Sequence, residues 1–306
     1  MTTRKRYVKI IAENFPLLQV RLVKSLGEGW GSVAILVNER YVFRFPKTDE
    51  AAQDLEKEIR LLPKLSRILS LQIPQFTFIG KSENGFSFVG YEIISGELLS
   101  VESFSKLSKT ERNRIADQLV RFMKEMQSFS TKETQSLHVP TKDLASRYLE
   151  YRKNIREHYV DLPSEVVEYI ERRFGEFFDS KQYMSSPFKL VHGDFAINHF
   201  IFDPIKRELS GIIDFGDAEV SDPDYDYLYL LRELDREFVE RVMDKMGVKN
   251  IDEKIRKVGY LVTFNYVNDI IVSYDLNIPS HWKTDAIEAL RKEAYPLIAV
   301  RTPSTM

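Results

Sequence analysis

The sequence predicts an α+β protein with two lobes: a small antiparallel β-sheet lobe with one helix, followed by a larger, mainly helical lobe. Three observations predict this division. Strand-like alternation runs through residues 18–46 and resumes at residues 73–94. A single stretch of helical spacing separates these two regions, and helical spacing dominates after residue 96. We therefore expect an N-terminal lobe at residues 1–94 and a C-terminal lobe at residues 95–306.

Each element of the N-terminal lobe has a local signal. A glycine-rich turn, "GEGWGS" at residues 27–32, joins two alternating stretches. Glu83-Asn84-Gly85 stands at a second hairpin turn. Between the two hairpins, residues 49–69 have helical spacing, and Pro63 is expected to end or kink this helix. The apolar residues on one face of the helix are Leu55, Ile59 and Leu62.

The C-terminal lobe combines capped helices with a short core that contains strands. Ser108 and Glu111 have the spacing of a capping box at the start of an amphipathic helix. We expect helices around residues 108–180 and 224–306. The catalytic core of this lobe is expected at residues 188–226, where short strands bracket polar loops.

The composition is that of an ordinary globular protein, and it excludes several kinds of site. Hydrophobic residues make up 43% and charged residues 29% of the 306 residues, and the net charge of −2 provides no basic field for nucleic acid. The absence of cysteine excludes disulfides, thiolate metal sites and cysteine nucleophiles. No segment resembles a signal peptide or a membrane span. We expect a cytoplasmic monomer that binds no nucleic acid and no membrane.

The segment "LVHGDFAINHFIFD", residues 190–203, places two histidines around one aspartate. His192 and Asp194 lie between two apolar runs, and His199 follows Asp194 by five residues. Taken alone, Asp194 could be a nucleophile, a metal ligand, a general base or a turn cap. His199 could be a metal ligand or a packed core residue. The remaining motifs of the chain have to decide between these roles.

Other motifs accompany this segment in a characteristic order. The glycine-rich turn links two strands, Arg44 lies on the next strand, Glu58 lies on the following helix, and Asp214 ends a later strand in "IIDFG". Each has an ordinary explanation alone: a hairpin tip, an edge residue, a solvated helix face or a turn. Their joint order is typical of the protein-kinase-like phosphotransferases, and it predicts a bilobal protein-kinase-like fold. A GxxxxGK[ST] motif is absent and the glycine turn does not lead into a helix, so neither a P-loop nor a Rossmann site is expected.

Phosphoryl transfer requires positioning and neutralisation of phosphate charge, and the first lobe carries residues for both. Backbone N–H groups can approach phosphates closely at a glycine-rich turn. The turn residues expected at the phosphates are Gly27, Gly29 and Ser32. Arg44, or Lys47 just after it, is expected to pair with the α- and β-phosphates, and Glu58 is expected to hold this cation in place.

The acceptor hydroxyl and a bridging metal ion require the groups of the second lobe. Asp194 is expected to accept the hydroxyl proton or to orient the hydroxyl, and Asp214 offers the hard oxygen ligand that a phosphate-bridging metal needs. His199 stands where the kinase pattern has asparagine, and an imidazole can coordinate a metal ion. Asn198 is a rival for that role. His192 is expected to brace the loop.

With these motifs in place, the chain resembles the aminoglycoside phosphotransferases, specifically the 2″-phosphotransferase branch. The resemblance covers nearly the whole chain and depends on "SLGEG", "AILVN", "VFRFPK", "FVGY", "VHGDFAINHFIFD" and "IIDFGDAEVSDPDYDY". It implies transfer of a nucleotide γ-phosphate to the 2″-hydroxyl of kanamycin- or gentamicin-type antibiotics, with Mg²⁺, and hence antibiotic resistance. It also implies that Asp194 is catalytic and that His199 and Asp214 bind Mg²⁺. Asp222 and Asp226 are expected to be structural.

The resemblance extends to the choice of nucleotide. Tyr91 fits the gatekeeper position, and in relatives with tyrosine there the bulky ring hinders adenine, so that GTP is preferred over ATP. An ordinary strand aromatic at Tyr91 would instead leave the pocket open to ATP. The backbone from Glu92 to Ile94 is expected to contact the base.

Recognition of a polycationic antibiotic requires several carboxylates. The residues expected at the antibiotic are Asp217, Glu233, Asp235, Glu237 and Trp282. The same charges could form a solvated helix face, and a lone tryptophan is often a packing residue. Arg232 departs from the acidic residue that relatives tend to carry, and its charge would repel the ligand unless it points outward or pairs with Glu233 or Asp235.

Three other functions remain to be weighed. The first is a kinase of the same fold that acts on another small-molecule hydroxyl, such as a macrolide, a sugar or an amino alcohol. The second is a non-catalytic binding module, which the filled catalytic positions disfavour. The third is a protein kinase, which is disfavoured because no activation segment ending in Ala-Pro-Glu follows Asp217.

Overall fold

The computed structural model describes residues 3–29, 31–184, 186–275 and 281–298. The chain divides into two compact units, and each unit is made of two segments of the sequence. The first unit combines Met1–Pro140 with His192–Glu219, and the second combines Thr141–Val191 with Val220–Met306. These units do not separate at residue 94, so the division into residues 1–94 and 95–306 stays a prediction.

The first unit contains a five-stranded antiparallel sheet of order β1-β2-β3-β5-β4 and a three-stranded sheet of order β6-β8-β9. Its helices and strands are α1 (Thr3–Asn14), β1 (Val23–Glu28), β2 (Ser32–Val37), β3 (Tyr41–Pro46), α2 (Asp49–Leu65), β4 (Phe76–Lys81), β5 (Ser87–Glu92), β6 (Glu97–Leu98), α3 (Val101–Ser105), α4 (Lys109–Ser128), α5 (Thr131–Ser136), η3 (Ile197–His199), β8 (Phe200–Asp203) and β9 (Glu208–Ile212). The predicted hairpins therefore form, although β1 begins several residues later than the alternation suggested.

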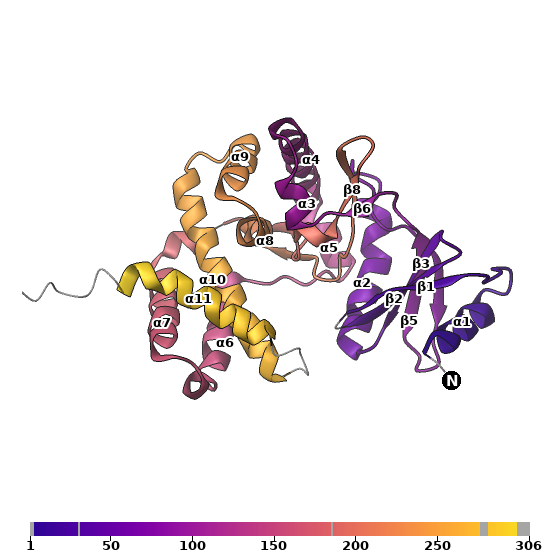
Figure 1. Cartoon of the computed structure of the whole chain (residues 1–306), viewed down its shortest axis with the longest axis horizontal. Helices are drawn as coiled ribbons and strands as arrows, with labels where there is room; N and C mark the ends of the chain where they lie inside the picture. The colour runs from indigo at the N-terminus through magenta and orange to yellow at the C-terminus, as the bar shows by residue number, and fades with distance from the viewer. Residues whose placement is uncertain (1–2, 30, 185, 276–280, 299–306) are drawn as a thin grey trace, which may run out of the picture. The chain divides into compact units, whose positions relative to one another are not determined.

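Strand β3 lies inside the large sheet (Figure 1), and strand alternation sends its neighbouring residues to opposite faces. Phe43 and Phe45 pack in a buried core with Ile10 and Ile11 of α1. Arg44, between them, faces α2 instead. The sheet is thus covered by two helices, whereas the sequence predicted one helix in this lobe, because the signal of α1 was not recognised.

Helix α2 begins where the sequence predicted and ends at Leu65, four residues before the end of the helical spacing. Thr48 caps its N-terminus by accepting a hydrogen bond from the backbone N–H of Ala51. Pro63 lies inside the helix, which continues to Leu65, because a proline this close to the C-terminal end disturbs only the last turn. The buried face of α2 also differs from the apolar stripe expected from the sequence, as the site described below shows.

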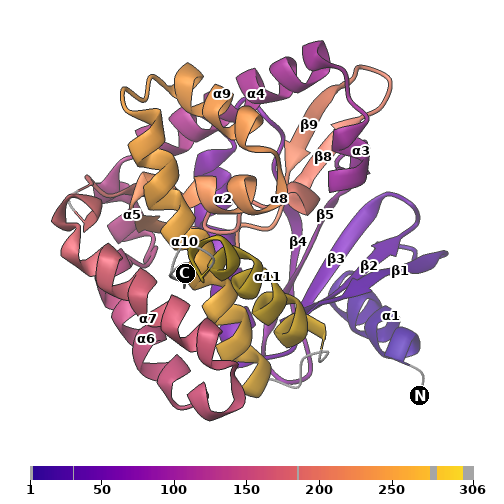
Figure 2. The same ribbon diagram turned by 60° about the vertical axis from the view of Figure 1, so that its left-hand side comes forward.

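The second unit is mainly helical. Its elements are α6 (Leu144–Arg156), η1 (Tyr159–Asp161), α7 (Ser164–Asp179), η2 (Lys181–Met184), β7 (Lys189–Val191), β10 (Glu219–Ser221), η4 (Pro223–Asp226), α8 (Tyr227–Glu233), α9 (Arg236–Met246), α10 (Ile251–Asp275) and α11 (His281–Ile298). Helices α6, α7, α10 and α11 lie side by side (Figure 2). Phe264 of α10 fills their shared core, with its ring centroid 4.3 Å from that of Phe174 and 4.6 Å from that of Tyr148.

The α+β class with an antiparallel N-terminal sheet and a helical C-terminal part is confirmed. The capping box is also confirmed, since Ser108 and Glu111 bond each other's backbone N–H groups at the start of α4. Within the described residues, no helix is both long and apolar enough to cross a membrane.

Candidate active site

Strand β3 and helix α2 bring Arg44 and Glu58 together. The Nη1 atom of Arg44 donates to Oε2 of Glu58 over 2.9 Å, and the Glu58 side chain is only 1% exposed. Burial lowers the pKa of Arg44, but Glu58 and Asp214 outweigh it and raise this pKa above its usual value. Burial raises the pKa of Glu58 to about 7, against the opposing effect of Arg44. The guanidinium is therefore permanently charged, whereas its carboxylate partner titrates near neutral pH.

Lys47 occupies a different place. Its Nζ atom lies 3.1 Å from Oε1 of Glu28, next to the glycine-rich turn, and no bond from it to Glu58 is found among the described residues. Its backbone N–H donates to the carbonyl of Gly31 over 2.7 Å. Of the two cations proposed for the phosphates, only Arg44 has Glu58 as its partner. Lys47 instead ties the end of β3 to the turn.

The turn joins β1 to β2, and the backbone N–H of Gly29 donates to the carbonyl of Ser32 over 3.0 Å. Gly27 has φ of +152°, and an added Cβ atom there would meet nothing within 4 Å. Trp30, at the centre of the quoted motif, lies outside the described residues. The backbone at Gly27 therefore has free space beside it, whereas Gly31 packs closely on Ala51.

The loop that carries Asp194 is fixed by His199. The Nδ1 atom of His199 lies 2.9 Å from the backbone carbonyl oxygen of Asp194, so it donates its proton there. In this tautomer Nε2 keeps its lone pair, and it lies 3.7 Å from Oδ2 of Asp214. Asn198, one residue earlier, is exposed. Between the two rivals, His199 is the residue that faces Asp214.

Asp214 follows β9 in a left-handed conformation, with φ of +68°. Its Oδ1 atom lies 3.3 Å from Nη2 of Arg44. Burial would raise the pKa of Asp214, but Arg44 and His199 outweigh it and hold this pKa below the usual range. Non-glycine residues adopt this backbone conformation at a cost of about 1–2 kcal/mol. The fold therefore tolerates strain to aim an ionised carboxylate at Arg44 and His199.

His192 has the bracing position that was expected. It is fully buried, and its Nε2 atom lies 3.1 Å from the carbonyl oxygen of Ile213. Its ring contacts the ring of Phe215, with centroids 4.6 Å apart. Burial lowers the pKa of His192 to about 3, helped by His199, so the ring is neutral. It links the Asp194 loop to Ile213, between the end of β9 and Asp214.

The donor atoms of this site fit a magnesium ion. His199 Nε2 and Asp214 Oδ2 are separated by 3.7 Å, and the Asp214 side chain is 47% exposed. Two ligands of one octahedral ion with bonds of about 2.1 Å lie roughly 3–4 Å apart. Among the described residues, no group of three or more His, Cys, Asp or Glu side chains forms a complete metal site. Mg²⁺ does not require one, because it is usually held by one or two protein ligands together with substrate phosphates and water.

Tyr91 and the segment after it lie beside the same cluster. Tyr91, on β5, is buried, and burial raises its pKa to about 12 while the charge of Arg44 opposes the rise. The Glu92 carboxylate faces outward to Arg40, 3.0 Å away, so only its backbone is available to a base. Ile94 is buried. The phenol of Tyr91 thus lies within the electrostatic reach of the residues proposed to bind phosphate.

The residues proposed to bind the acceptor are dispersed over both units. Asp217 is exposed in the first unit. In the second, Glu233 ends α8, Asp235 caps α9 by accepting from the backbone N–H of Phe238 over 2.8 Å, and Glu237 pairs with Arg241 over 2.5 Å. Trp282 lies on α11 and is 39% exposed. The structure does not gather these side chains into one described cluster, so their shared role stays a prediction.

Arg232 adopts neither arrangement weighed from the sequence. It points to α10, where Nη2 lies 2.6 Å from Oδ2 of Asp269 and Nη1 donates to Oδ1 of Asn265. Its guanidinium also lies over the ring of Tyr266, 4.3 Å from the centroid. The partner is therefore Asp269 rather than Glu233 or Asp235. The positive charge is compensated locally.

Lys57 is a residue of the site that the sequence analysis missed. It is only 5% exposed, and its Nζ atom donates to the carbonyl of Gly216 and to Oδ1 of Asp54, the latter over 3.2 Å. Ile59, expected on the apolar face of α2, is only partly buried, whereas Lys57 and Glu58 are buried. The signal was available, since Lys57 lies one turn before the buried Leu61.

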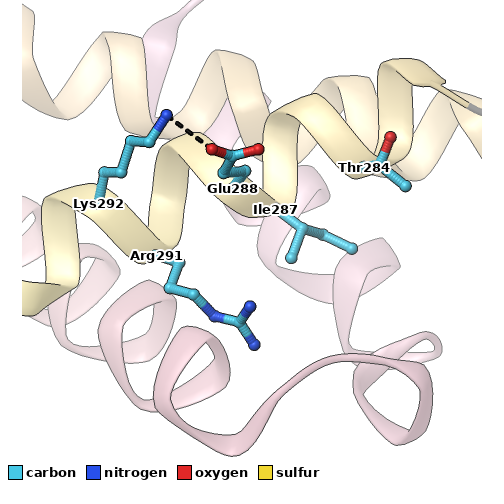
Figure 3. A pocket seen from close by; sticks show the side chains of 5 residues that line it. All are labelled: Thr284, Ile287, Glu288, Arg291 and Lys292. Carbon is cyan, nitrogen blue, oxygen red and sulfur yellow. Dashed lines mark ion pairs between the residues drawn. The ribbon is translucent and has the colours of Figure 1, made fainter.

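A surface hollow of about 630 Å³ lies along α11 (Figure 3) and is lined by none of the predicted site residues. Lys292 there pairs with Glu288 over 2.7 Å, as in an ordinary exposed helix.

Comparisons with known proteins identify the family and the fold of the chain. The family model described as "Phosphotransferase enzyme family" matches residues 23–252. The chain is similar to the solved GDP complex of wild-type aminoglycoside 2'-phosphotransferase-IIIa, with 34% identity over 96% of this chain and 99% of that chain, and a TM-score of 0.92. For the GDP and kanamycin complex of APH(2″)-IIIa, the identity is 36%, the coverage 95% and 98%, and the TM-score 0.91. For the streptomycin–ATP–APH(2″)-IIa complex, these values are 25%, 95% and 96%, and 0.75.

Proposed function

Because this chain belongs to the phosphotransferase enzyme family, we propose that it transfers the γ-phosphate of GTP to the 2″-hydroxyl of an aminoglycoside antibiotic. The observation that carries this proposal is the likeness, at 36% identity over 95% of the chain, to an enzyme solved with GDP and kanamycin. The cellular consequence would be resistance to that antibiotic. The residues of the first unit supply the chemistry.

Asp194 is proposed as the group that receives the proton. Its carboxylate is 27% exposed, so an acceptor hydroxyl can reach it. The hydroxyl oxygen forms a bond to the γ-phosphorus, the bond from this phosphorus to the β–γ bridging oxygen breaks, and GDP leaves. The hydroxyl proton passes to Asp194. His199 holds the backbone of Asp194 at its carbonyl, which fixes the position of the carboxylate.

Arg44 is proposed to bind the α- and β-phosphates. Its planar guanidinium can donate two parallel hydrogen bonds, and Glu58 prevents it from swinging away. His199 and Asp214 are the residues that would hold Mg²⁺, as their donor atoms allow. The bound ion would supply neutralisation of the charge on the transferred phosphoryl group.

The preference for GTP over ATP is proposed on two grounds. The ring of Tyr91 on β5 is buried, and we propose that it narrows the space for a base next to the segment from Glu92 to Ile94. Two solved structures of type-IIIa enzymes, with identities of 34% and 36%, contain GDP, whereas the structure solved with ATP has 25% identity. We therefore expect Tyr91 to disfavour adenine.

The second unit is proposed to recognise the amino groups of the antibiotic through Glu233, Asp235, Glu237 and Trp282. The positive charge of Arg232 would repel a cationic antibiotic that binds at α8. Asp269 compensates this charge and so reduces the repulsion. Glu237 has a strongly exposed carboxylate, and its ion pair with Arg241 is of the surface type that contributes little and exchanges easily. Asp217 of the first unit is proposed as a further acidic contact.

The test is a nucleotide-turnover assay with purified protein, Mg²⁺ and kanamycin, comparing GTP with ATP side by side. Kanamycin-dependent release of GDP with little ADP is expected, and phosphorus–proton NMR of the product should locate the phosphate on the 2″-oxygen. Expression in a susceptible bacterium should raise the kanamycin concentration needed to stop growth. Turnover with ATP alone would remove the role of Tyr91 and leave the enzyme.

A second candidate is a kinase of the same fold for another small-molecule hydroxyl. The observation that favours it is the composition of the α8–α9 segment, where Arg232 is basic, Asp235 is used as a helix cap and Glu237 is paired. These contacts reduce the negative charge available to a polycation. Turnover with a macrolide, a sugar or an amino alcohol, and none with kanamycin or gentamicin, would establish this alternative.

A further inference from the structure

Lys57 places a buried positive charge against the loop that carries Asp214. Only 5% of this residue is exposed, and its Nζ atom donates to the backbone carbonyl of Gly216. Its second partner is the carboxylate of Asp54, one turn earlier on α2, at 3.2 Å. Burying an ammonium group is costly unless it is paired and hydrogen-bonded. Packing alone would be served better by an apolar residue, so this charge requires another explanation.

The bonded carbonyl belongs to the segment that positions the whole site. Gly216 lies two residues after Asp214, whose φ of +68° is a strained conformation. Asp217, the next residue, packs so closely on Gly193 that a Cβ atom there would lie 2.2 Å from the carbonyl oxygen of Asp217. Gly193 directly precedes Asp194. The Gly216 carbonyl is thus the attachment point of a segment that contacts both the Asp214 carboxylate and the Asp194 loop.

Helix α2 therefore supplies two neighbouring side chains to two different parts of the site. Glu58 bonds Arg44, the residue proposed at the phosphates, and Lys57 bonds the Asp214 segment. An added Cβ atom on Gly216 would lie 3.8 Å from Oε1 of Glu58 and 3.9 Å from Cβ of Asp54, so this segment rests directly on α2. One rigid helix thereby sets the distance between the phosphate-binding cation and the metal-binding carboxylate.

We propose that Lys57 is a positioning residue for phosphoryl transfer: its ammonium group, countered by Asp54, holds the Gly216 carbonyl and thereby fixes the Asp214 carboxylate in its strained orientation toward His199 and Arg44. The inference rests on phosphoryl transfer from a nucleotide, as proposed above, and does not depend on the identity of the acceptor. Partners that orient a metal ligand from outside the coordination sphere typically contribute about 10–100-fold to metal affinity or activity.

The first test compares Lys57→Met with Lys64→Met. Lys64 lies on the same helix but is exposed, so its substitution removes the same charge without touching the loop. Hydrogen exchange of the backbone amides at residues 213–218, measured on the nucleotide-free enzyme, should accelerate in Lys57→Met and remain unchanged in Lys64→Met. The Mg²⁺ concentration for half-maximal GTP turnover should rise about tenfold or more in Lys57→Met, while the KM of the acceptor stays constant.

The second test uses a hollow of about 600 Å³ that Lys57 lines together with His138, Pro140 and residues of the β4–β5 hairpin. Lys57→Ala should leave space that a small alkylammonium ion can enter from this side. Ethylammonium or propylammonium should then restore turnover and slow the exchange of residues 213–218, whereas neutral propanol should not. A side chain that only packs would show no dependence on the charge of the added molecule.

Two further variants keep the proposal testable if Lys57→Met does not fold. Lys57→Arg retains the charge and should retain most of the Mg²⁺ dependence of the wild type. Asp54→Asn removes the countercharge from a partly exposed position and should raise the Mg²⁺ requirement by a smaller factor. Unchanged loop exchange together with an unchanged Mg²⁺ requirement in Lys57→Met would overturn the proposal. If Lys57→Met does not fold, the same two results in Asp54→Asn and Lys57→Ala would overturn it. A wild-type enzyme without kanamycin-dependent turnover would contradict the proposed acceptor, while the exchange measurement would still test Lys57.

Discussion

Two ionic clusters, one in each unit, use similar residues in opposite ways. The Asp214 cluster of the first unit consists of Arg44, Glu58, Asp214, His199 and Lys57. The Lys257 cluster of the second unit consists of Asp222, Asp224, Lys254 and Lys257. In the Lys257 cluster, Nζ of Lys257 lies 2.5 Å from Asp222 and 2.6 Å from Asp224, and the Lys257 side chain is only 4% exposed. Lys254 adds a second cation 2.6 Å from Asp224.

The two clusters differ in whether their charged side chains remain accessible to a ligand. In the Lys257 cluster two carboxylates meet two ammonium groups, all at short distances, and Asp222 also accepts from the backbone N–H of Asp224. In the Asp214 cluster the Asp214 side chain is 47% exposed and its backbone is strained. Charges that are buried and fully paired specify structure. A partly exposed carboxylate held in a strained conformation indicates a site with a ligand.

The largest effect is expected at Asp194, beside the Asp214 cluster. Asp194→Ala should reduce kcat by about 10²–10⁴-fold, the range for loss of a group that accepts the proton in the transition state. GDP affinity, measured by calorimetry, and the melting temperature should change little. Asn198→Ala, a substitution at an exposed neighbour, is the matched control and should retain wild-type kcat. Unchanged turnover of Asp194→Ala would contradict the proposed mechanism.

In the Lys257 cluster we expect a substitution to lower the stability and to leave turnover nearly unchanged. Lys257→Met leaves Asp222 and Asp224 facing each other without a buried cation, which should lower the free energy of unfolding by about 3–5 kcal/mol. Lys254→Met should cost much less, because Lys257 still neutralises Asp224. Urea denaturation measures both. Turnover per folded molecule, assayed well below the melting temperature, should remain near that of the wild type. A loss of kcat without a loss of stability would contradict the proposed difference between the two clusters.

A pH dependence is expected in the Asp214 cluster, because Glu58 bonds Arg44, the cation proposed at the phosphates. Burial raises the pKa of Glu58 to about 7, so its carboxylate is ionised above this pH and protonated below it. Protonation removes the negative charge that Glu58 presents to Arg44, so the KM for GTP should rise by about fivefold between pH 7 and pH 6. Steady-state kinetics between pH 6 and 8 measure this. The Glu58→Gln variant should show a high KM that does not vary with pH, and a parallel rise in that variant would assign the titration to another group.

The smallest effects are expected at the Arg232–Asp269 pair, and they should have opposite signs. Asp269→Asn leaves the Arg232 charge uncompensated and should raise the KM for kanamycin a few-fold, whereas Arg232→Met leaves the Asp269 charge and should lower it. Both effects should shrink in about 0.5 M salt, which screens interactions between charges farther apart than the Debye length. Equal changes in the two variants would indicate altered packing, and no change in either would place the acceptor elsewhere.

Much of the first unit could be predicted from the sequence because its signals are local. The two hairpins, the Ser108–Glu111 capping box and the helix bearing Glu58 all form where alternation, turn residues and spacing predicted them. The order of motifs was enough to place Asp194, His199 and Asp214 in one site. The additional helix α1 was missed because its apolar stretch, from Tyr7 to Ala12, is short.

Side-chain partners could not be predicted, because they depend on which distant segments the fold brings within hydrogen-bond range. Arg44 on β3 and Lys47 just after this strand are near neighbours, yet Arg44 bonds Glu58 of α2 whereas Lys47 bonds Glu28. His199 and Asn198 are adjacent, yet only His199 faces Asp214. Arg232 pairs with Asp269, 37 positions along the chain, rather than with its close neighbours.

By itself, the sequence determined the α+β class, the ordered set of catalytic motifs and the residue types that phosphoryl transfer requires, since these depend on periodicity and on the chemistry of single side chains. The tertiary structure alone decided which cation meets Glu58, which of two neighbours faces Asp214, and that Lys57 is buried against the carbonyl of Gly216. Local patterns specify where a backbone turns or coils. The partner of a buried charge is selected only when the chain closes around it, because desolvation makes an unpaired charge there too costly.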